Sequence, residues 1–497
     1  MAGLTERRGP NSSDSFWTWR QLMFRFLDRL TPEHVEAIAA FVQMEMLEAG
    51  YATNVEFHYL HHQPGGIPYA NPAEMAERII AATARTGIGL TLLPVHYEFG
   101  GCDKRALGPG QIRFGNDFDA FEKLHAAAAS SLKALPEDCG LGVAPHSLRA
   151  VAFDDLKRHR EMAGENPLHM HLAEQIAEVE EVLALHGKRP VELVLDHMDL
   201  GGTNCFIHCT QMLPHETDGL ARSGAIAGLC PITEASLGDG IFDGVRWMDA
   251  GGRIAVGSDS NIRISLSEEL RTLDHSQRLR DHSRAALASV DKSTGRRLHD
   301  AINLGGSIAA GRNCGAIAPG KLADLVALDD RAIDLEGRKG DTILDCFVFA
   351  GNASLVSDVW SAGRHVVSDG MHRERGGNRG RLPKGDARTW RCNLMTGELK
   401  NWQSIQEEVL RRITTRLWKP GEFIPNEEEL SREFGCARAT VNRALRSLAD
   451  SGLLERRRKA GTRIALSPIR KATLDIPVIR REIESKGLAY PGQLSAF

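Results

Sequence analysis

The chain has 497 residues, 42% hydrophobic and 25% charged, which is an ordinary globular composition that predicts two to four domains. No apolar run of about 18 residues and no apolar core of a secretory signal occur, and the nine cysteines form no CxxC pair, so we expect a reduced, cytoplasmic protein with no membrane partner. The net charge of −4 is unevenly distributed. Residues 401–470 hold 14 Lys/Arg and 9 Asp/Glu, whereas the rest of the chain holds 47 Lys/Arg and 56 Asp/Glu. The C-terminal part is therefore the one that suits a polyanion.

Two helices are expected first, over residues 14–30 and 32–48, with Thr31-Pro32-Glu33 at the start of the second. Short apolar runs then alternate with amphipathic segments, a pattern that predicts parallel strands covered by helices. The helical segments include 73–86, 117–134 and 176–186. The seven strand-like runs are 52–62, 89–98, 141–150, 167–175, 204–212, 225–232 and 253–261.

Polar side chains gather at the carboxyl ends of these runs, where a (β/α)8 TIM-type barrel keeps its active site. Seven strands are found instead of eight, and nothing before Ala52 has the pattern of a strand. We therefore expect a barrel that lacks its first strand. The polar residues at the strand ends are His61, His96, His146, His171, His208 and Asp259.

After helical segments near 265–312, three β-rich stretches predict a small β-sandwich beside the barrel: 314–329, 341–351 and 356–370. Residues rich in Gly, Arg and Pro follow and predict a linker. The expected domains are the barrel at 1–312, the sandwich portion at 313–372, the linker at 373–398, a winged helix-turn-helix at 399–467 and a short remnant at 468–497.

The winged helix-turn-helix is expected from three helices and a hairpin. Ile405, Val409, Ile413 and Leu417 form an apolar stripe on a first helix. Asn426 is a plausible N-cap of a short second helix that ends at Phe434, and Gly435 makes the turn. A third helix is expected over 438–450, and a hairpin pairs 453–455 with 462–464.

The segment His169-Met170-His171-Leu172-Ala173-Glu174 ends a strand, and alternation places its two histidines on one face. A metal ligand near a carboxylate suits hydrolysis, because the metal acidifies water and the carboxylate moves its proton. Buried histidines that only form hydrogen bonds are an equally good explanation of this segment alone. His208 and Asp259, at the ends of later strands, favour the metal site.

The segments PLHMHLAEQ (167–175), FIHCT (206–210), VGSDSN (256–261) and GAIAPGKLADLVALD (315–329) resemble the amidohydrolase superfamily. With SFWTWR (15–20), EFHYLHHQPGG (56–66) and APHSLRA (144–150), the chain resembles the formimidoylglutamate deiminases over residues 1–370. This resemblance implies Zn2+ as cofactor and the hydrolysis of N-formimidoyl-L-glutamate, a step in histidine degradation.

By the same resemblance, His171 and Asp259 are zinc ligands, Glu174 carries the proton from the zinc water to ammonia, and His208 polarises the imine; Asp259 is counted among the catalytic residues. The family contacts its substrate at the positions of Arg20, Tyr59, His146 and Arg149. Guanidinium groups suit the two substrate carboxylates. Surface salt bridges are the alternative for Arg20 and Arg149.

Family members also carry an HxH motif on their first barrel strand, which binds zinc and has no counterpart in this sequence. Only two of four protein ligands are therefore expected, fewer than a catalytic zinc site normally uses. We expect an incomplete site and doubtful activity. Recruitment of His61 or His62 as a substitute ligand is the alternative.

Residues 402–466 resemble the GntR family of transcription regulators, and in detail its histidine-utilisation repressors. The resemblance implies a homodimer that binds double-stranded DNA, with the third helix in the major groove and the wing on the backbone. A solvated basic run is the alternative for the wing. The residues expected to contact DNA are Arg438, Thr440, Arg443, Arg456, Arg457, Arg458, Lys459 and Gly461.

Residues 468–497 are too few for the effector domain of that family, so no urocanate response is expected. Three functions remain open at this point. The chain is an enzyme with an appended DNA-binding domain, a DNA-binding protein that uses an inactive barrel for dimerisation, or a remnant of two joined genes that does neither well.

Overall fold

The computed structural model describes residues 16–375, 402–414, 418, 421–450, 453–457 and 461–465. They fall into two compact units, Met1–Pro383 and Lys384–Phe497. The division lies within the predicted linker; most of that linker and the segment 468–497 lie outside the described residues. No helix within the described ranges is long and apolar enough to cross a membrane.

The first unit contains two sheets of parallel strands, and each of the seven predicted runs contains a strand. One sheet holds β1 (Thr53–His58), β2 (Gly89–His96), β3 (Gly140–Leu141) and β4 (Ala144–Pro145). The other has the order β5 (Leu168–Leu172), β6 (Asn204–His208), β7 (Ile226–Leu229), β8 (Arg253–Val256). Isolated bridges from Val143 to Leu168 and from Ser147 to His171 join the two sheets.

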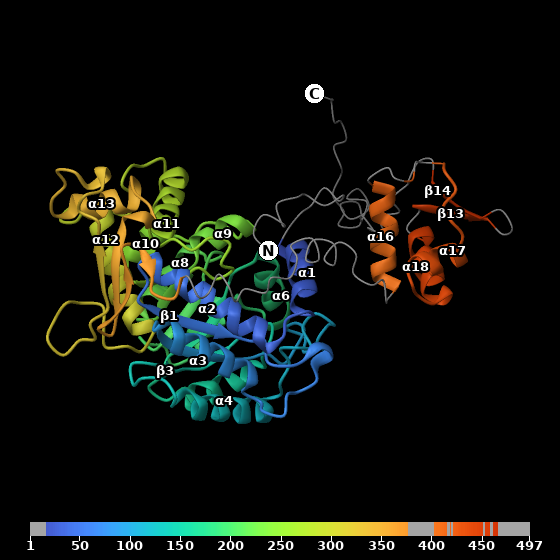
Figure 1. The fold of residues 1–497 in the computed structure, drawn as a ribbon, viewed down its shortest axis with the longest axis horizontal. Coiled ribbons are helices and arrows are strands. Elements are labelled where there is room, and N and C mark those ends of the chain that lie inside the picture. Colours follow the sequence, from blue (N-terminus) through green and yellow to red (C-terminus); the bar gives the residue numbers. More distant parts are fainter. Residues whose placement is uncertain are drawn as a thin grey trace, which may run out of the picture. The chain divides into compact units, whose positions relative to one another are not determined.

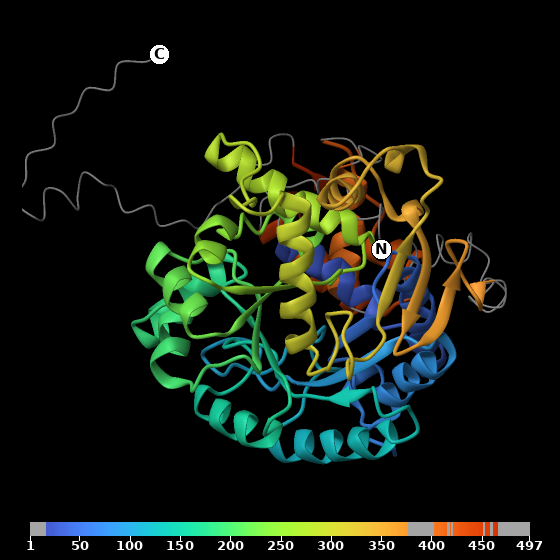
Figure 2. The same ribbon diagram turned by 90° about the vertical axis from the view of Figure 1, so that its left-hand side faces the viewer.

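Helices surround these strands, as Figure 2 shows. Thr31 caps the second helix as predicted, because its hydroxyl accepts a hydrogen bond from the His34 amide at 3.4 Å. The helices are α1 (Phe16–Leu27), α2 (Pro32–Glu48), α3 (Glu74–Thr86), α4 (Phe118–Leu132), α5 (Leu156–Ala163), α6 (Ile176–His186), α7 (Pro190–His197), α8 (Pro214–Arg222), α9 (Pro231–Leu237), α10 (Gly244–Asp249), α11 (Leu266–Asp281) and α12 (Thr294–Ala309).

The strand orders end at β1 and at β8, and no pairing between these two strands occurs within the described part of the chain. A cavity of about 1740 Å³ lies along both strands. Apolar side chains of α2, among them Ile38 and Val42, and Ile302 of α12 also line it. The cavity therefore adjoins both the wall and the interior of the barrel.

A small antiparallel sheet completes the first unit, in the order β12 (Met371–His372), β11 (Arg364–Ser368), β10 (Val356–Ser361), β9 (Leu325–Leu328). The prediction of β structure at 341–351 is wrong, because α13 (Asp341–Phe349) is a helix. Ile343 and Phe347 stand four residues apart, so a helix places both on one side, against α11 and α12. This packing outweighs the β propensity of the segment.

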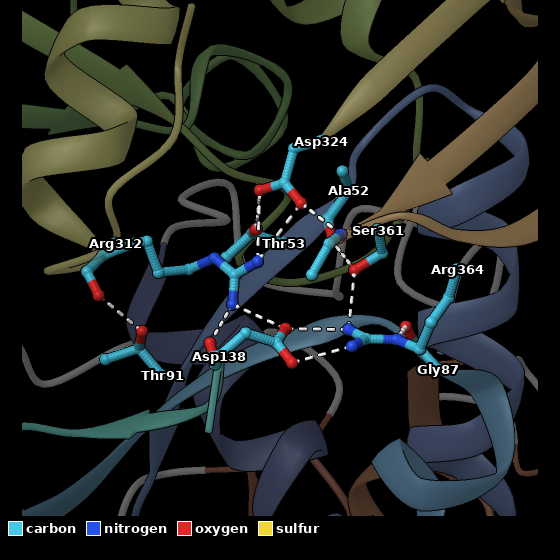
Figure 3. A network of polar contacts seen from close by, with 11 residues as sticks. Ala52, Thr53, Gly87, Thr91, Asp138, Arg312, Asp324, Ser361 and Arg364 are labelled. Atoms are coloured by element: carbon cyan, nitrogen blue, oxygen red, sulfur yellow. Dashed lines mark hydrogen bonds and ion pairs between the residues drawn. The ribbon is translucent and has the colours of Figure 1, made fainter. Parts of the chain in front are cut away.

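A buried polar network fastens this sheet to the barrel (Figure 3). Arg364 of β11 donates both Nη1 and Nη2 to the Asp138 carboxylate, each at 2.7 Å. Arg312, which follows α12, donates to Asp138 at 3.0 Å and to Asp324 at 3.1 Å. Thr53 of β1 donates to the same Asp324 carboxylate at 3.2 Å. Three segments far apart in sequence thus share two carboxylates.

The second unit is a winged helix-turn-helix with α16 (Trp402–Thr414), α17 (Glu427–Glu433) and α18 (Arg438–Asp450), labelled in Figure 1. The strands β13 (Leu454–Arg457) and β14 (Gly461–Ile464) form the predicted hairpin. Asn426 caps α17 through its side-chain oxygen, which accepts from the amides of Glu428 and Glu429, each at 3.0 Å. The core contains Ile405, Val409, Leu430, Val441, Leu445, Leu448, Leu454 and Ile464; Ile413 is partly buried and Leu417 lies outside the described residues.

Candidate functional site

The carboxyl ends of the barrel strands bring the predicted site residues together. His171 lies at the end of β5 and His208 ends β6, and their ring centroids are 5.4 Å apart. The ring of His146, just after β4, stacks on His171 at 4.8 Å. Tyr59, after β1, and Asp259, after β8, line the same cavity as His171.

His171 is oriented by the backbone. Its Nδ1 lies 3.1 Å from the carbonyl oxygen of His146, and because a carbonyl only accepts, Nδ1 carries the proton. The Phe57 ring packs edge-on against it at 4.6 Å. Burial, helped by the nearby charge of His208, lowers the pKa of His171 to about 3. The imidazole is therefore neutral, with a lone pair on Nε2, which is the form that binds metals.

Glu174 is a buried carboxylate between two cationic groups. One oxygen lies 3.8 Å from Nε2 of His208, and the other lies 3.9 Å from Nη2 of Arg149. Burial alone would raise the pKa of Glu174, but the cationic His208 and Arg149 outweigh it and hold the pKa below its ordinary value. The carboxylate is thus ionised and able to accept a proton.

His208 has the opposite charge state. It is 1% exposed, and its Nδ1 donates to the Glu234 carboxylate at 3.2 Å. Burial would lower the pKa of His208, but Glu174, Glu234 and Asp259 raise it to about 10. The buried imidazolium is a hydrogen-bond donor beside the ionised Glu174, so this pair can both accept and donate protons.

Sequence reasoning missed Glu234. It stands in the first turn of α9, just beyond the carboxyl end of β7, and its carboxylate also accepts from the Cys230 amide at 2.8 Å. The sequence did contain a signal for Glu234: it is a carboxylate three residues after Pro231, at the carboxyl end of a predicted strand, where the active site is expected. Glu234 positions His208 and supplies part of the charge that keeps it protonated.

The four predicted substrate-binding residues also belong to this site. Arg20 donates to the hydroxyl of Tyr97 at 2.8 Å, and Tyr59 packs on His146 with ring centroids 5.6 Å apart. Surface salt bridges are ruled out for both arginines, because Arg20 and Arg149 are 7% and 6% exposed. Tyr97 was missed by the sequence analysis, since only the fold brings β2 to α1.

Other histidines at the strand ends also form hydrogen bonds within the barrel. His169 lies 2.8 Å from the carbonyl oxygen of Ala309, His61 lies 2.9 Å from that of Val95, and His62 lies 2.8 Å from that of Gly115. His96 is bonded to His159 and to the Asn116 carbonyl. His169, His61 and His62 are therefore buried, and each ring is held by a backbone carbonyl.

A catalytic zinc ion needs three protein ligands and one open position. His171 and Asp259 offer a neutral imidazole and a carboxylate at the cavity, both ordinary zinc ligands. Among the described residues, however, no three His, Cys, Asp or Glu side chains are grouped so that they could hold one metal ion. Catalytic zinc uses three protein ligands, so the described residues do not complete such a site.

The second unit presents a basic surface on the third helix and the hairpin. Arg438 and Arg443 of α18 are exposed, Thr440 is partly buried, and Arg456 of β13 is exposed. Gly461, at the start of β14, has φ of +87°, a conformation that favours glycine. The strand β13 includes Arg457, whereas Arg458 and Lys459 lie outside the described residues.

Known protein families match both units of the chain. The profile of the amidohydrolase family matches residues 5–366, and that of the gntR family of bacterial regulatory proteins matches residues 401–464. A formimidoylglutamate deiminase from Pseudomonas aeruginosa is 44% identical over 374 residues, which cover 75% of this chain and 82% of that protein.

Solved structures give the same result. An amidohydrolase from Brucella melitensis superposes with a TM-score of 0.75 at 46% identity, over 78% of this chain and 86% of that one. A zinc-bound adenosine deaminase from Xanthomonas campestris shares the fold, with a TM-score of 0.64 at 21% identity over 78% and 82% of the two chains. This chain therefore belongs to the amidohydrolase family, with a TIM-barrel type fold, and also carries a gntR-family domain.

Proposed function

We propose that the barrel binds N-formimidoyl-L-glutamate and is built for its hydrolysis to N-formyl-L-glutamate and ammonia. The observation that carries this proposal is the buried Glu174 carboxylate, one oxygen of which lies 3.8 Å from Nε2 of the buried His208. The deiminase from Pseudomonas aeruginosa supports the choice of substrate. In this reaction, water adds to the amidine carbon and the C–N bond to the departing nitrogen breaks.

The charges of the site suit this substrate. Its two carboxylates call for guanidinium partners, and Arg20 and Arg149 are the buried arginines beside the site. Glu174 would take a proton from the attacking water and pass it to the leaving nitrogen. The imidazolium of His208 would stabilise the tetrahedral adduct by donating a hydrogen bond. His146 and Tyr59 would pack around the formimino group.

We further propose that the metal site of this chain is incomplete. Zinc would lower the pKa of the attacking water, but His171 and Asp259 are only two ligands. The cavity is lined by both residues and by β1 and β8, which do not pair with each other within the described part of the chain. We therefore expect weak zinc binding and slow turnover.

The test is zinc content and ammonia release from N-formimidoyl-L-glutamate, measured on the purified chain supplied with zinc, together with substrate binding by calorimetry. Binding with little zinc and little ammonia is the expected result. About one zinc per chain with fast turnover would refute the incomplete site but support the enzyme. Absence of binding would refute the substrate. Glu174→Gln should still bind, and Glu165→Gln, an exposed acid, is the matched control.

A second function rests on the other unit. We propose that the winged helix-turn-helix binds double-stranded DNA as a homodimer, at a palindromic site in genes of histidine utilisation. The exposed arginines of α18 support this proposal. Selection of duplexes from a random library, followed by titration at several salt concentrations, tests it. A selected palindrome with salt-dependent binding is expected; if no duplex is retained, the proposal is wrong.

A further inference from the structure

One carboxylate joins the two DNA-facing elements of the winged helix-turn-helix. Glu427 is the first residue of α17, and its side chain accepts a hydrogen bond from Asn442 at 2.7 Å. The guanidinium of Arg438, at the start of α18, donates to it at 3.4 Å, and that of Arg456 in the hairpin donates to it as well. Glu427 thus contacts the predicted recognition helix and the wing at once.

The contacts of Glu427 differ in how easily a DNA phosphate could replace the carboxylate. The side chain of Glu427 is 18% exposed, whereas that of Arg438 is 67% exposed and that of Arg456 is 29% exposed. An exposed ion pair contributes little, so a DNA phosphate can replace the carboxylate at Arg438. On the less exposed side of the cluster, the partly buried Asn442 holds Glu427 in place. Before DNA binds, the carboxylate keeps two long side chains from sampling many rotamers.

The carboxylate also removes positive charge from this surface. Binding to DNA of any sequence depends on the number of phosphates that cations neutralise, so a carboxylate paired with Arg438 and Arg456 weakens it. Binding to one sequence depends on side chains already held in the required geometry. The same group therefore has opposite effects on the two kinds of binding.

We propose that Glu427 is a positioning residue for sequence discrimination: it holds Arg438, Asn442 and Arg456 in one arrangement and suppresses binding to unrelated DNA. The inference rests on the proposed DNA-binding function. Sequence discrimination would then depend on Glu427 of the second helix as well as on the basic residues of the third helix and the wing.

The test uses the full chain and two duplexes of equal length: one selected from a random library by the wild-type chain, and one of mixed sequence. In Glu427→Gln, the ratio of the two affinities should fall about tenfold. Binding to the mixed-sequence duplex should become tighter, with a salt dependence steeper by about one released ion. A purely structural role would weaken both kinds of binding together.

Glu428→Gln is the matched control. Glu428 is the next residue in the same helical turn, and its carboxylate pairs within α17, with Arg432. Both variants remove one negative charge near the helix N-terminus, but Glu427 is the one of the two whose carboxylate contacts Arg438, Asn442 and Arg456 in the described part of the domain. The control should leave the affinity ratio unchanged. If both variants change the ratio equally, the effect is general electrostatics and the inference is wrong.

Glu427→Asp provides a second, independent test, because it keeps the charge but shortens the side chain. The affinity ratio should fall while binding to the mixed-sequence duplex stays near the wild-type value. If circular dichroism shows that Glu427→Gln is unfolded, the affinity ratio of Glu427→Asp provides the test. An unchanged ratio in either folded variant overturns the inference, whereas a wild-type chain that binds neither duplex overturns the DNA-binding function itself.

Discussion

At the scale of single residues, the charge of His208 depends on the carboxylate behind it. Glu234 accepts from Nδ1 of His208 at 3.2 Å and helps raise the pKa of that imidazole to about 10. Glu234→Gln keeps an acceptor but removes the charge, so the pKa of His208 should fall by at least about one unit. Titration of the His208 ring by NMR measures this.

The surface offers a control for that titration. Glu192 lies 3.0 Å from His215, and the two side chains are 33% and 60% exposed. Glu192→Gln should leave the pKa of His208 unchanged. If both variants alter it equally, or neither does, Glu234 does not set the charge of the site.

His169 makes the barrel sensitive to acid. Burial lowers its pKa to about 4, below the value of about 6.5 in the unfolded chain. The unfolded state therefore binds more protons below pH 6.5, and stability is lost as the pH falls toward 4. At pH 5 this single group should cost about 2 kcal/mol relative to pH 7.5.

His169→Gln tests that account. Glutamine retains an N–H donor for the Ala309 carbonyl, which lies 2.8 Å from the histidine ring, but does not titrate. The free energy of unfolding in urea should therefore drop less between pH 7.5 and pH 5 in the variant than in the wild type. Equal pH dependence in both chains would show that His169 is not held neutral in the fold.

At the scale of elements, helix caps fix where segments begin. The Asn426 side chain satisfies two amides at the start of α17, and its loss should cost about 1 kcal/mol. Asn426→Ala should speed hydrogen exchange across 427–433 in the full chain, measured by mass spectrometry. Asn426→Asp retains the acceptor and should exchange like the wild type; if all three chains exchange alike, the cap does not hold the helix.

Local patterns were sufficient for most elements and failed where packing decides. Short apolar runs located the strands, and Thr31 and Asn426 marked the starts of their helices correctly. The prediction for residues 341–349 was wrong because their apolar residues suit a strand or a helix equally well. Contact with α11 and α12 selects the helix. In the site, Glu234 and Tyr97 were missed because their partners lie 26 and 77 residues away.

At the scale of the whole barrel unit, Arg312 connects Asp138 and Asp324, two residues that lie far apart in the sequence. Its side chain is 3% exposed and pairs with Asp138 and Asp324, which are 6% and 9% exposed. Arg312→Met would leave two buried carboxylates short of a partner, which should destabilise the unit by about 3–5 kcal/mol. Arg331→Met, which breaks an exposed pair with Asp329, should cost at most about 1 kcal/mol.

A double variant that removes the charges of both Arg312 and Asp324 tests whether the network stabilises the unit through charge balance alone. In Arg312→Met with Asp324→Leu, one unpaired carboxylate is gone and Asp138 keeps both bonds from Arg364. Apolar side chains of similar size often replace buried ion pairs without loss, so urea unfolding should recover much of the stability lost in Arg312→Met. If the double variant is no more stable than the single one, the network stabilises the junction by more than charge balance, and the small sheet depends on it for its position.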